Sequence, residues 1–287
     1  MIGGDSNYYE TLTEYDEKWE FKFVYNKLTQ IVLMGSLLDI GCGDGRFINL
    51  VGDRLKATGI DFNLKAIQSA RMKRGINVYQ ATFEEFIERF PERRYDVVTM
   101  FHILEHMESP DELIGNVKKT LNPNGLVFIS VPNPNRWTLH WVREVWDYPP
   151  HHLTRWSSHN LRVLLESYGF EMIEECTERM ETLSQARNAF RDIVWAVVFR
   201  RFSFGIASRL DAGRERIAVL NGNTLAGYAR TLLRLLLSGL VSVKGRAVQL
   251  LSYVLALMTY PLFLLGNYGG RSLLIIARLR NEGCDGR

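Results

Sequence analysis

The sequence predicts an α/β fold in which a doubly wound, mostly parallel β-sheet is covered by helices on both faces. Between residue 35 and about residue 180, short β-branched or aliphatic runs alternate with longer stretches of helical periodicity, as is typical of parallel βαβ units. A further apolar run at 271–278 follows a long excursion and supplies a last strand. Composition agrees, because 46% hydrophobic residues in a chain of 287 suit one large core or two modest ones.

The elements follow one another in a regular order. Residues 8–34 interleave aromatic and charged side chains and predict one or two amphipathic helices that end before Gly35. Seven strands are then expected near residues 36–40, 56–60, 76–80, 95–101, 126–131, 169–176 and 271–278. The predicted domains are an N-terminal helical cover at 1–34, an α/β domain at 35–180 with 269–280, and a helical, apolar and basic insertion at 181–268 before the last strand.

A glycine-rich turn follows the first predicted strand. Gly41, Gly43 and Gly45 stand between that strand and a predicted helix at 46–53, so the backbone can turn sharply and a ligand can lie against it. Asp61 ends the next predicted strand, 18 residues beyond Gly43, close to the spacing at which a carboxylate binds a ribose diol. Asp44 in the turn would repel a pyrophosphate. The pattern therefore indicates a nucleotide cofactor that is not a dinucleotide.

Five short motifs in this order resemble those of the class I S-adenosylmethionine-dependent methyltransferases. They are Leu38–Gly45, Gly59–Asp61, Tyr95–Val98, Leu104–His106 and Leu121–Leu126, with agreement over about residues 35–176 and again at 271–280. The resemblance implies a Rossmann-like, seven-stranded sheet that binds S-adenosyl-L-methionine. It places Asp39, Gly41, Cys42 and Gly43 around the methionine part of the cofactor, Asp61 on the ribose and Phe62 against the adenine, with Phe83 and Phe101 as further contacts.

One position departs from that family. After the third strand the family often has an acid near the adenine amine, whereas this chain has Gln80, Ala81, Thr82 and Phe83. Thr82 is expected to accept the same hydrogen bond more weakly, because a hydroxyl is a poorer acceptor than a carboxylate. A domain that binds the cofactor without turnover stays open as an alternative.

Histidines gather in two short segments beside the predicted cleft. His102, Glu105 and His106, followed downstream by His152, resemble the Glu-x-x-Glu-His plus His arrangement of ubiquinone-type O-methyltransferases and small-RNA 2′-O-methyltransferases, which hold a divalent cation. His102 takes the place of the first Glu. The resemblance implies that all four residues are metal ligands, and three imidazoles with one carboxylate favour Zn²⁺, Mn²⁺ or Fe²⁺ over Mg²⁺.

The same histidines are the catalytic candidates. Without a metal, His102 or His152 is the expected general base, since an imidazole titrates near neutral pH, and His106 lies beside them. Either route predicts O-methylation. A structural alternative is that His106 braces the following helix while His152 satisfies a loop carbonyl.

The insertion carries most of the positive charge. Residues 186–246 contain eleven Lys or Arg and three acids, and residues 247–270 contain no charged side chain, although the net charge of the whole chain is only +3. Apolar side chains beside a cationic rim are typical of a monotopic surface on anionic lipid. A single membrane crossing is not expected, because the strand at 271–278 must return to the sheet. A soluble lid packed on the domain or on a second subunit is the alternative, which leaves a homo-oligomer open.

Together these features predict an enzyme that O-methylates a small amphiphilic acceptor, such as a prenylated molecule or a lipid-linked sugar. An RNA 2′-O-methyltransferase is the second hypothesis, but nucleic acid is not the expected partner because arginines alternating with apolar runs make a poor phosphate-tracking groove. Three scattered cysteines and the lack of a basic and apolar leader in the first residues predict a cytoplasmic protein on the cytoplasmic face of a membrane.

Overall fold

The computed structural model describes residues 18–31, 34–72, 76–136, 147–179, 250, 252–258 and 269–280. The chain divides into two units, one of residues 1–136, 144–178 and 269–287, the other of residues 137–143 and 179–268. The sheet and all the candidate site residues belong to the first unit. Of the predicted insertion at 181–268, only residues 250 and 252–258 are described, and they are helical. The rest of that prediction, and residues 8–17 of the predicted N-terminal helices, lie outside the described residues.

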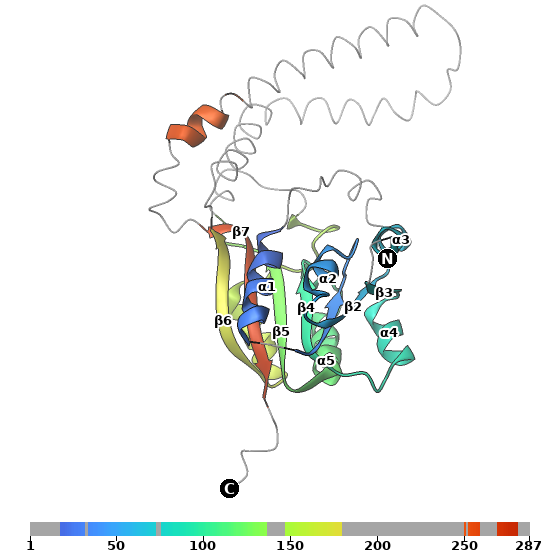
Figure 1. The fold of residues 1–287 in the computed structure, drawn as a ribbon. Coiled ribbons are helices and arrows are strands. Elements are labelled where there is room, and N and C mark those ends of the chain that lie inside the picture. Colours follow the sequence, from blue (N-terminus) through green and yellow to red (C-terminus); the bar gives the residue numbers. More distant parts are fainter. Residues whose placement is uncertain are drawn as a thin grey trace, which may run out of the picture. The chain divides into compact units, whose positions relative to one another are not determined.

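Seven strands form one sheet in the order β3-β2-β1-β4-β5-β7-β6 (Figure 1). The strands are β1 Ser36–Ile40, β2 Lys56–Asp61, β3 Asn77–Gln80, β4 Tyr95–Phe101, β5 Leu121–Pro132, β6 Phe170–Arg179 and β7 Gly269–Leu279. The five strands from β3 to β5 pair in parallel, while β7 runs antiparallel to β5. This architecture confirms the predicted Rossmann-like, mostly parallel, seven-stranded sheet.

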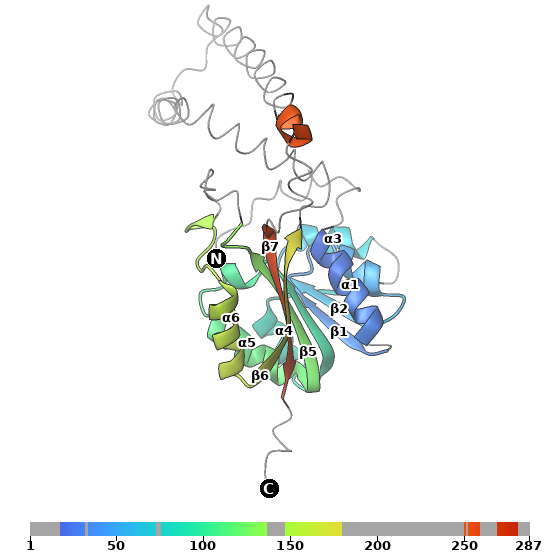
Figure 2. The same cartoon turned by 90° about the vertical axis from the view of Figure 1, so that its left-hand side faces the viewer.

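Helices cover both faces of the sheet, as Figure 2 shows. α1 Trp19–Ile31, α2 Arg46–Val51 and α3 Leu64–Arg71 pack on one face, and α4 Phe83–Arg89, α5 Pro110–Thr120 and α6 Ser158–Ser167 pack on the other. The short 3-10 helix η2, Leu104–His106, follows β4. Among the described residues, no helix is both long and apolar enough to cross a membrane.

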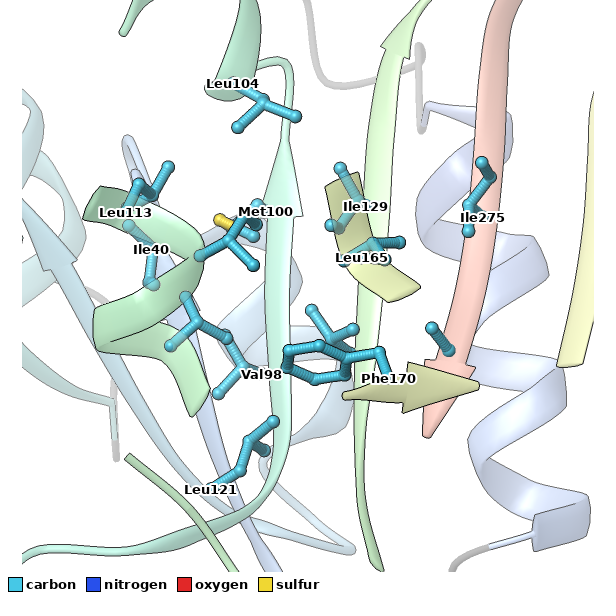
Figure 3. Close-up of a cluster of buried hydrophobic side chains, with 14 of the residues drawn as sticks. Ile40, Val98, Met100, Leu104, Leu113, Leu121, Ile129, Leu165, Phe170 and Ile275 are labelled. Atoms are coloured by element: carbon cyan, nitrogen blue, oxygen red, sulfur yellow. The ribbon is translucent and has the colours of Figure 1, made fainter. Parts of the chain in front are cut away.

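Strand β4 lies in the middle of the sheet and is buried on both faces. Val98 and Met100 point into the core that Leu113 of α5 and Leu165 of α6 complete (Figure 3), while Val97 faces the opposite core under α1 and α2. Continuous apolar runs of this kind are expected of parallel strands with helices on both faces. The segment that leaves the carboxyl end of β4 therefore starts from a rigid position.

Helix α1 buries one stripe of side chains against the sheet. Glu20, Val24 and Leu28 recur every four residues and are all buried, so the stripe is apolar except for one carboxylate. Phe21 packs edge-on against Phe101, with ring centroids 4.8 Å apart. Near the other end, the Lys27 ammonium lies 2.8 Å from a carboxylate oxygen of Glu174 in β6. α1 is thus tied to the sheet over its whole length.

Candidate active site

The glycine turn has the backbone conformation that the sequence predicts. Gly41, Gly43 and Gly45 have φ angles of 74°, 55° and 73°, in the left-handed region that side chains with a Cβ rarely adopt. A Cβ added to Gly41 would lie 2.1 Å from Cδ1 of Ile103. The loop after β4 therefore packs directly on the loop after β1, and no side chain larger than hydrogen fits between them.

Asp61 fastens the end of β2 to this turn. Its carboxylate accepts hydrogen bonds from the backbone N–H groups of Gly43, at 2.9 Å, and Asn63, at 2.8 Å. Burial raises the pKa of Asp61, and these two hydrogen bonds oppose the rise. Since a carboxylate oxygen accepts more than one hydrogen bond, Asp61 can hold the turn and still receive a ribose hydroxyl.

Asp39, on β1, is buried beneath the turn. Its Oδ1 accepts a hydrogen bond of 2.7 Å from the Thr99 hydroxyl, and only 2% of the residue is exposed. Burial, opposed by this hydrogen bond, raises the pKa of Asp39 to about 7, and the nearby Asp61 charge contributes to the rise. A fixed positive group above the turn would favour the ionised carboxylate.

Phe62 and Cys42 differ in whether their side chains can reach a cofactor. Phe62 is 64% exposed and so is free to cover a flat base. The Cys42 side chain points into the core beneath Gly59, whose added Cβ would lie 2.7 Å from its Sγ, so Cys42 can contact a ligand only through its backbone.

Thr82, Phe83 and Phe101 have structural partners of their own. The Thr82 hydroxyl accepts from the Glu85 N–H and forms a capping box at the start of α4. Phe83 is buried in the core on that face. The Phe101 ring packs with Phe21 and Phe47, each at 4.8 Å. The structure thus shows a structural role for all three residues, and cofactor contact by them stays a prediction.

Three of the four predicted metal ligands converge at the carboxyl end of β4. One ligand atom each of Glu105, His106 and His152 lies within 4.8 Å of the other two. Glu105 is 1% exposed, and its buried Oε2 is without a hydrogen-bond partner, a costly state unless a proton, cation or polar ligand completes it. We call these three residues the Glu105 cluster.

The histidines of the Glu105 cluster each lie beside a polar neighbour. His106 Nδ1 lies 2.8 Å from the carbonyl oxygen of His151, so it donates there, and its Nε2 lies 4.0 Å from Oε1 of Glu105. His152 Nδ1 lies 3.7 Å from Oδ1 of Asp147, which is itself paired with the buried Arg136. Burial lowers the pKa of His152, a shift that the Glu105 charge opposes, so its imidazole is neutral near pH 7.

His102 does not join the cluster, contrary to the sequence-based prediction. Its Nε2 lies 3.0 Å from Oε1 of Glu20, and its Nδ1 lies 3.2 Å from Oε1 of Glu105. Burial would lower the pKa of His102, but the hydrogen bonds and charges of the two carboxylates raise it to about 9. An imidazolium that donates from both nitrogens has no lone pair for a metal and takes up no proton. These contacts argue against His102 as a ligand or a general base.

The sequence-based reasoning missed three buried charged residues that the structure places around the site: Glu20, Arg136 and Asp147. Glu20 had a usable signal, because a carboxylate four residues before Val24 stands on the apolar stripe of α1. Arg136 and Asp147 had none, since nothing in the local pattern predicts that they pair with each other.

The cofactor turn and the Glu105 cluster are parts of one site. The backbone N–H of Leu153 donates to the Glu105 carbonyl at 2.8 Å, which brings the segment with His152 to η2, while Ile103, two residues before Glu105, packs on Gly41. The site therefore brings together a turn suited to a nucleotide, a carboxylate with an unpaired oxygen and two imidazoles. Such a set can align an acceptor, hold a cation or accept a proton.

Comparisons with known proteins identify the family of the chain. The methyltransferase domain family matches residues 21–175. The ubiquinone biosynthesis O-methyltransferase of Pasteurella multocida (strain Pm70) is 33% identical over 111 residues, which are 34% of this chain and 46% of that protein. The enzyme with the same name from Erwinia tasmaniensis is 35% identical over 105 residues, 34% of this chain and 43% of that protein. The chain thus spans about half the length of the curated relatives it matches.

A solved structure supports the fold. The S-adenosylmethionine-dependent methyltransferase from Archaeoglobus fulgidus matches with a TM-score of 0.51 and 20% sequence identity, over 90% of this chain and 94% of that chain. At this identity the likeness concerns the fold alone. The sequence and fold comparisons together confirm the resemblance that the five motifs predict.

Proposed function

Because this chain belongs to the methyltransferase domain family, we propose that the whole protein transfers a methyl group from S-adenosylmethionine to a hydroxyl oxygen. The domain at residues 21–175 is of the S-adenosylmethionine-dependent kind, so that molecule is its cofactor. The acceptor and the residues that assist transfer belong to the proposal. They rest on the geometry of the Glu105 cluster and on the names of the relatives.

The observation that carries O-methylation is the Glu105 cluster beside the cofactor turn. Transfer from a sulfonium is an in-line displacement, so the protein must align the acceptor oxygen, exclude water and remove a proton from the hydroxyl. The lowered pKa of His152 keeps its imidazole neutral, and its second nitrogen faces away from Asp147, so His152 is the proposed proton acceptor. Glu105 and His106 orient the hydroxyl.

The donor set of the Glu105 cluster also fits a divalent cation. Glu105 offers its carboxylate, whose Oε1 lies 4.0 Å from Nε2 of His106, and His106 and His152 each offer one ring nitrogen. Two imidazoles and one carboxylate favour Zn²⁺, Mn²⁺ or Fe²⁺ over Mg²⁺. Such an ion would lower the pKa of a bound hydroxyl. The fit supports the predicted metal with three protein ligands, without His102.

The acceptor that we propose is amphiphilic. The described helical residues 250 and 252–258 expose large apolar side chains, among them Leu250 at 67% and Met258 at 73%, and the basic stretch at 186–246 precedes them. Exposed apolar groups near Lys and Arg favour peripheral contact with anionic lipid. The curated relatives are named for ubiquinone biosynthesis, which supports a prenylated phenol or a similar molecule.

The catalytic proposal is tested by turnover of substituted proteins. Formation of S-adenosylhomocysteine is measured with a soluble catechol and with a short-chain prenylated quinol as acceptors. Glu105→Gln and His152→Gln should each lower turnover by about 100-fold, since general acid–base assistance contributes about 10²–10⁴-fold, while the affinity for S-adenosylhomocysteine stays unchanged. His159→Gln is the matched control, because His159 is exposed on α6. Full turnover in both variants would refute the assigned roles.

Flotation with vesicles tests the lipid part separately. Vesicles that contain phosphatidylglycerol should carry the full-length protein upward at low salt, and neutral phosphatidylcholine vesicles should carry less, because the basic stretch adds attraction only to anionic surfaces. Two results would remove the argument for a lipid-associated acceptor. In the first, the protein reaches the upper fractions equally well without vesicles; in the second, neither kind of vesicle carries it upward. Both would leave methyl transfer untouched.

A further inference from the structure

A buried hydrogen-bond chain links helix α1 to the Glu105 cluster. Glu20, 3% exposed, accepts from His102 Nε2 at 3.0 Å, and His102 Nδ1 lies 3.2 Å from Oε1 of Glu105. Glu20 comes from the helix before the sheet, His102 from the end of β4 and Glu105 from η2. Three segments of the chain therefore meet through one imidazole ring.

The His102 ring has little freedom to move. Its backbone has a φ of 57°, unusual for a residue with a Cβ, and its N–H donates to the Ser130 carbonyl at 2.9 Å. The hydroxyls of Ser130 on β5 and Ser272 on β7 each lie 3.3 Å from Nε2. Unusual backbone angles of this kind persist only where the surrounding contacts hold them, and they are frequent at functional sites.

These contacts of His102 fix the position of the Glu105 carboxylate. One of its oxygens, Oε1, is held by His102, and the other, Oε2, is buried without a hydrogen-bond partner. A carboxylate that is held by a hydrogen bond keeps a fixed orientation, and here Oε1 also lies 4.0 Å from Nε2 of His106. His106 has its own orienting neighbour, the carbonyl of His151, and His102 plays the same part for Glu105.

We propose that Glu20 and His102 are positioning residues: Glu20 fixes the His102 ring, and the ring holds the Glu105 carboxylate in place beside His106 and His152. This inference rests on the proposed function of the Glu105 cluster. It makes α1 a part of the active site, although α1 contributes no group that touches the reacting atoms. It also assigns His102 a use that differs from the ligand position it occupies in the motif.

A purely structural role for the contact between Glu20 and His102 predicts a different result. If the contact between Glu20 and His102 only fastened α1 to the sheet, its loss would lower stability and leave the cluster unchanged. Loss of a positioning partner should instead lower ligand affinity at the cluster by about 10–100-fold, as outer partners of metal-binding residues do. Ligand affinity at the Glu105 cluster therefore distinguishes the two possibilities, whereas protein stability does not.

The experiment uses the full chain, with Co²⁺ as the probe and its visible absorption as the signal. Glu20→Gln keeps the shape of the side chain but removes its charge, and it should weaken Co²⁺ binding by about 10–100-fold with unchanged affinity for S-adenosylhomocysteine. Lys27→Gln is the matched control, because it breaks the contact of α1 with Glu174 and leaves His102 alone. This control should bind Co²⁺ like the unsubstituted protein.

A double substitution tests the route of the effect. If Glu20 acts through His102, then Glu20→Gln should cost nothing further in a His102→Asn background, because coupled residues are not additive. Asn is chosen because it tolerates a positive φ. Additive losses would overturn the proposal, as would Co²⁺ affinity in Glu20→Gln within about twofold of the unsubstituted protein.

Other outcomes are also decisive. Should Glu20→Gln fail to fold, Glu20→Asp, which is too short to reach His102 from the same backbone, takes its place with the same expectation. If the unsubstituted protein binds no Co²⁺, the metal in the proposed function fails, and a crystal structure of Glu20→Gln decides this inference instead. A Glu105 carboxylate in an unchanged position in that structure would overturn it.

Discussion

The substitution Asp39→Asn should stabilise the protein without ligand at alkaline pH. Asp39 is fully buried beneath the glycine turn, and its pKa rises from an ordinary value of 3.8 to about 7. Because the folded-state pKa lies above the ordinary value, the side chain costs nothing well below pH 3.8. The destabilisation then grows with pH and levels off above pH 7. Asn has the same shape, can keep the hydrogen bond from Thr99 and carries no charge.

The magnitude follows from the two pKa values. Each pH unit between them is worth about 1.4 kcal/mol, so the ionised carboxylate destabilises the folded chain by about 4 kcal/mol at pH 8 and by about 1.5 kcal/mol at pH 5. Denaturant unfolding of both proteins at these two pH values measures the difference. Asp39→Asn should be the more stable protein at both, with the larger gain at pH 8.

Cofactor binding should favour the ionised form of Asp39, which is the form that destabilises the protein without ligand. The sulfonium and ammonium groups of S-adenosylmethionine favour an ionised Asp39, so the affinity of the unsubstituted protein should rise between pH 6 and pH 8, and that of Asp39→Asn should be lower and should change less. Isothermal titration at both pH values gives this result. If Asp39→Asn gained no stability at pH 8, burial would not raise the pKa of Asp39 in the folded chain, and the argument from burial would be refuted.

Three further substitutions test the rest of the cofactor site. Gly41→Ala places a Cβ at positive φ and 2.1 Å from Ile103, so thermal unfolding should show a loss of about 2–4 kcal/mol, and a second change of Ile103→Ala should recover part of it. Thr82→Ala removes the capping box of α4 and should cost about 1 kcal/mol in denaturant unfolding; no loss would mean that the cap contributes nothing. Asp61→Asn should weaken the calorimetric affinity for S-adenosylhomocysteine by at least about 10-fold, since hydrogen bonds to charged groups are worth about 1.5–3 kcal/mol, and an unchanged affinity would exclude Asp61 from the ribose site.

The sequence predicted what depends on local pattern. The seven strands, the positive φ angles of the glycine turn and the place of Asp61 all follow from residues that are near one another in the chain. Strand β5 begins earlier than predicted, at Leu121, because Tyr95 pairs with Leu121 across a shift in register. Such a pairing depends on the partner strand rather than on the residues of β5 itself.

The role of His102 could not be predicted in the same way. A histidine in that motif has the same residue type whether it binds a metal, accepts a proton or donates to two carboxylates. The structure distinguishes these roles because it brings Glu20, 82 positions earlier in the chain, to Nε2 of His102. The pairing of Arg136 with Asp147 is hidden from the sequence for the same reason.

The last two strands of the sheet have consequences for how the chain is assembled. A Cβ on Gly270, near the start of β7, would lie 2.8 Å from the carbonyl oxygen of Glu178, near the end of β6, and at the far end the N–H of Arg280 donates to Gly169 at 3.0 Å. The end of β6 therefore lies directly beside the start of β7, as in a hairpin. A turn of a few residues would be long enough to connect the two strands. In the sequence, residues 180–268 stand between these two strands, and lengthening a loop costs only about 0.6 kcal/mol per doubling. The pairing of β6 with β7 therefore tolerates a long connection at little cost in loop entropy.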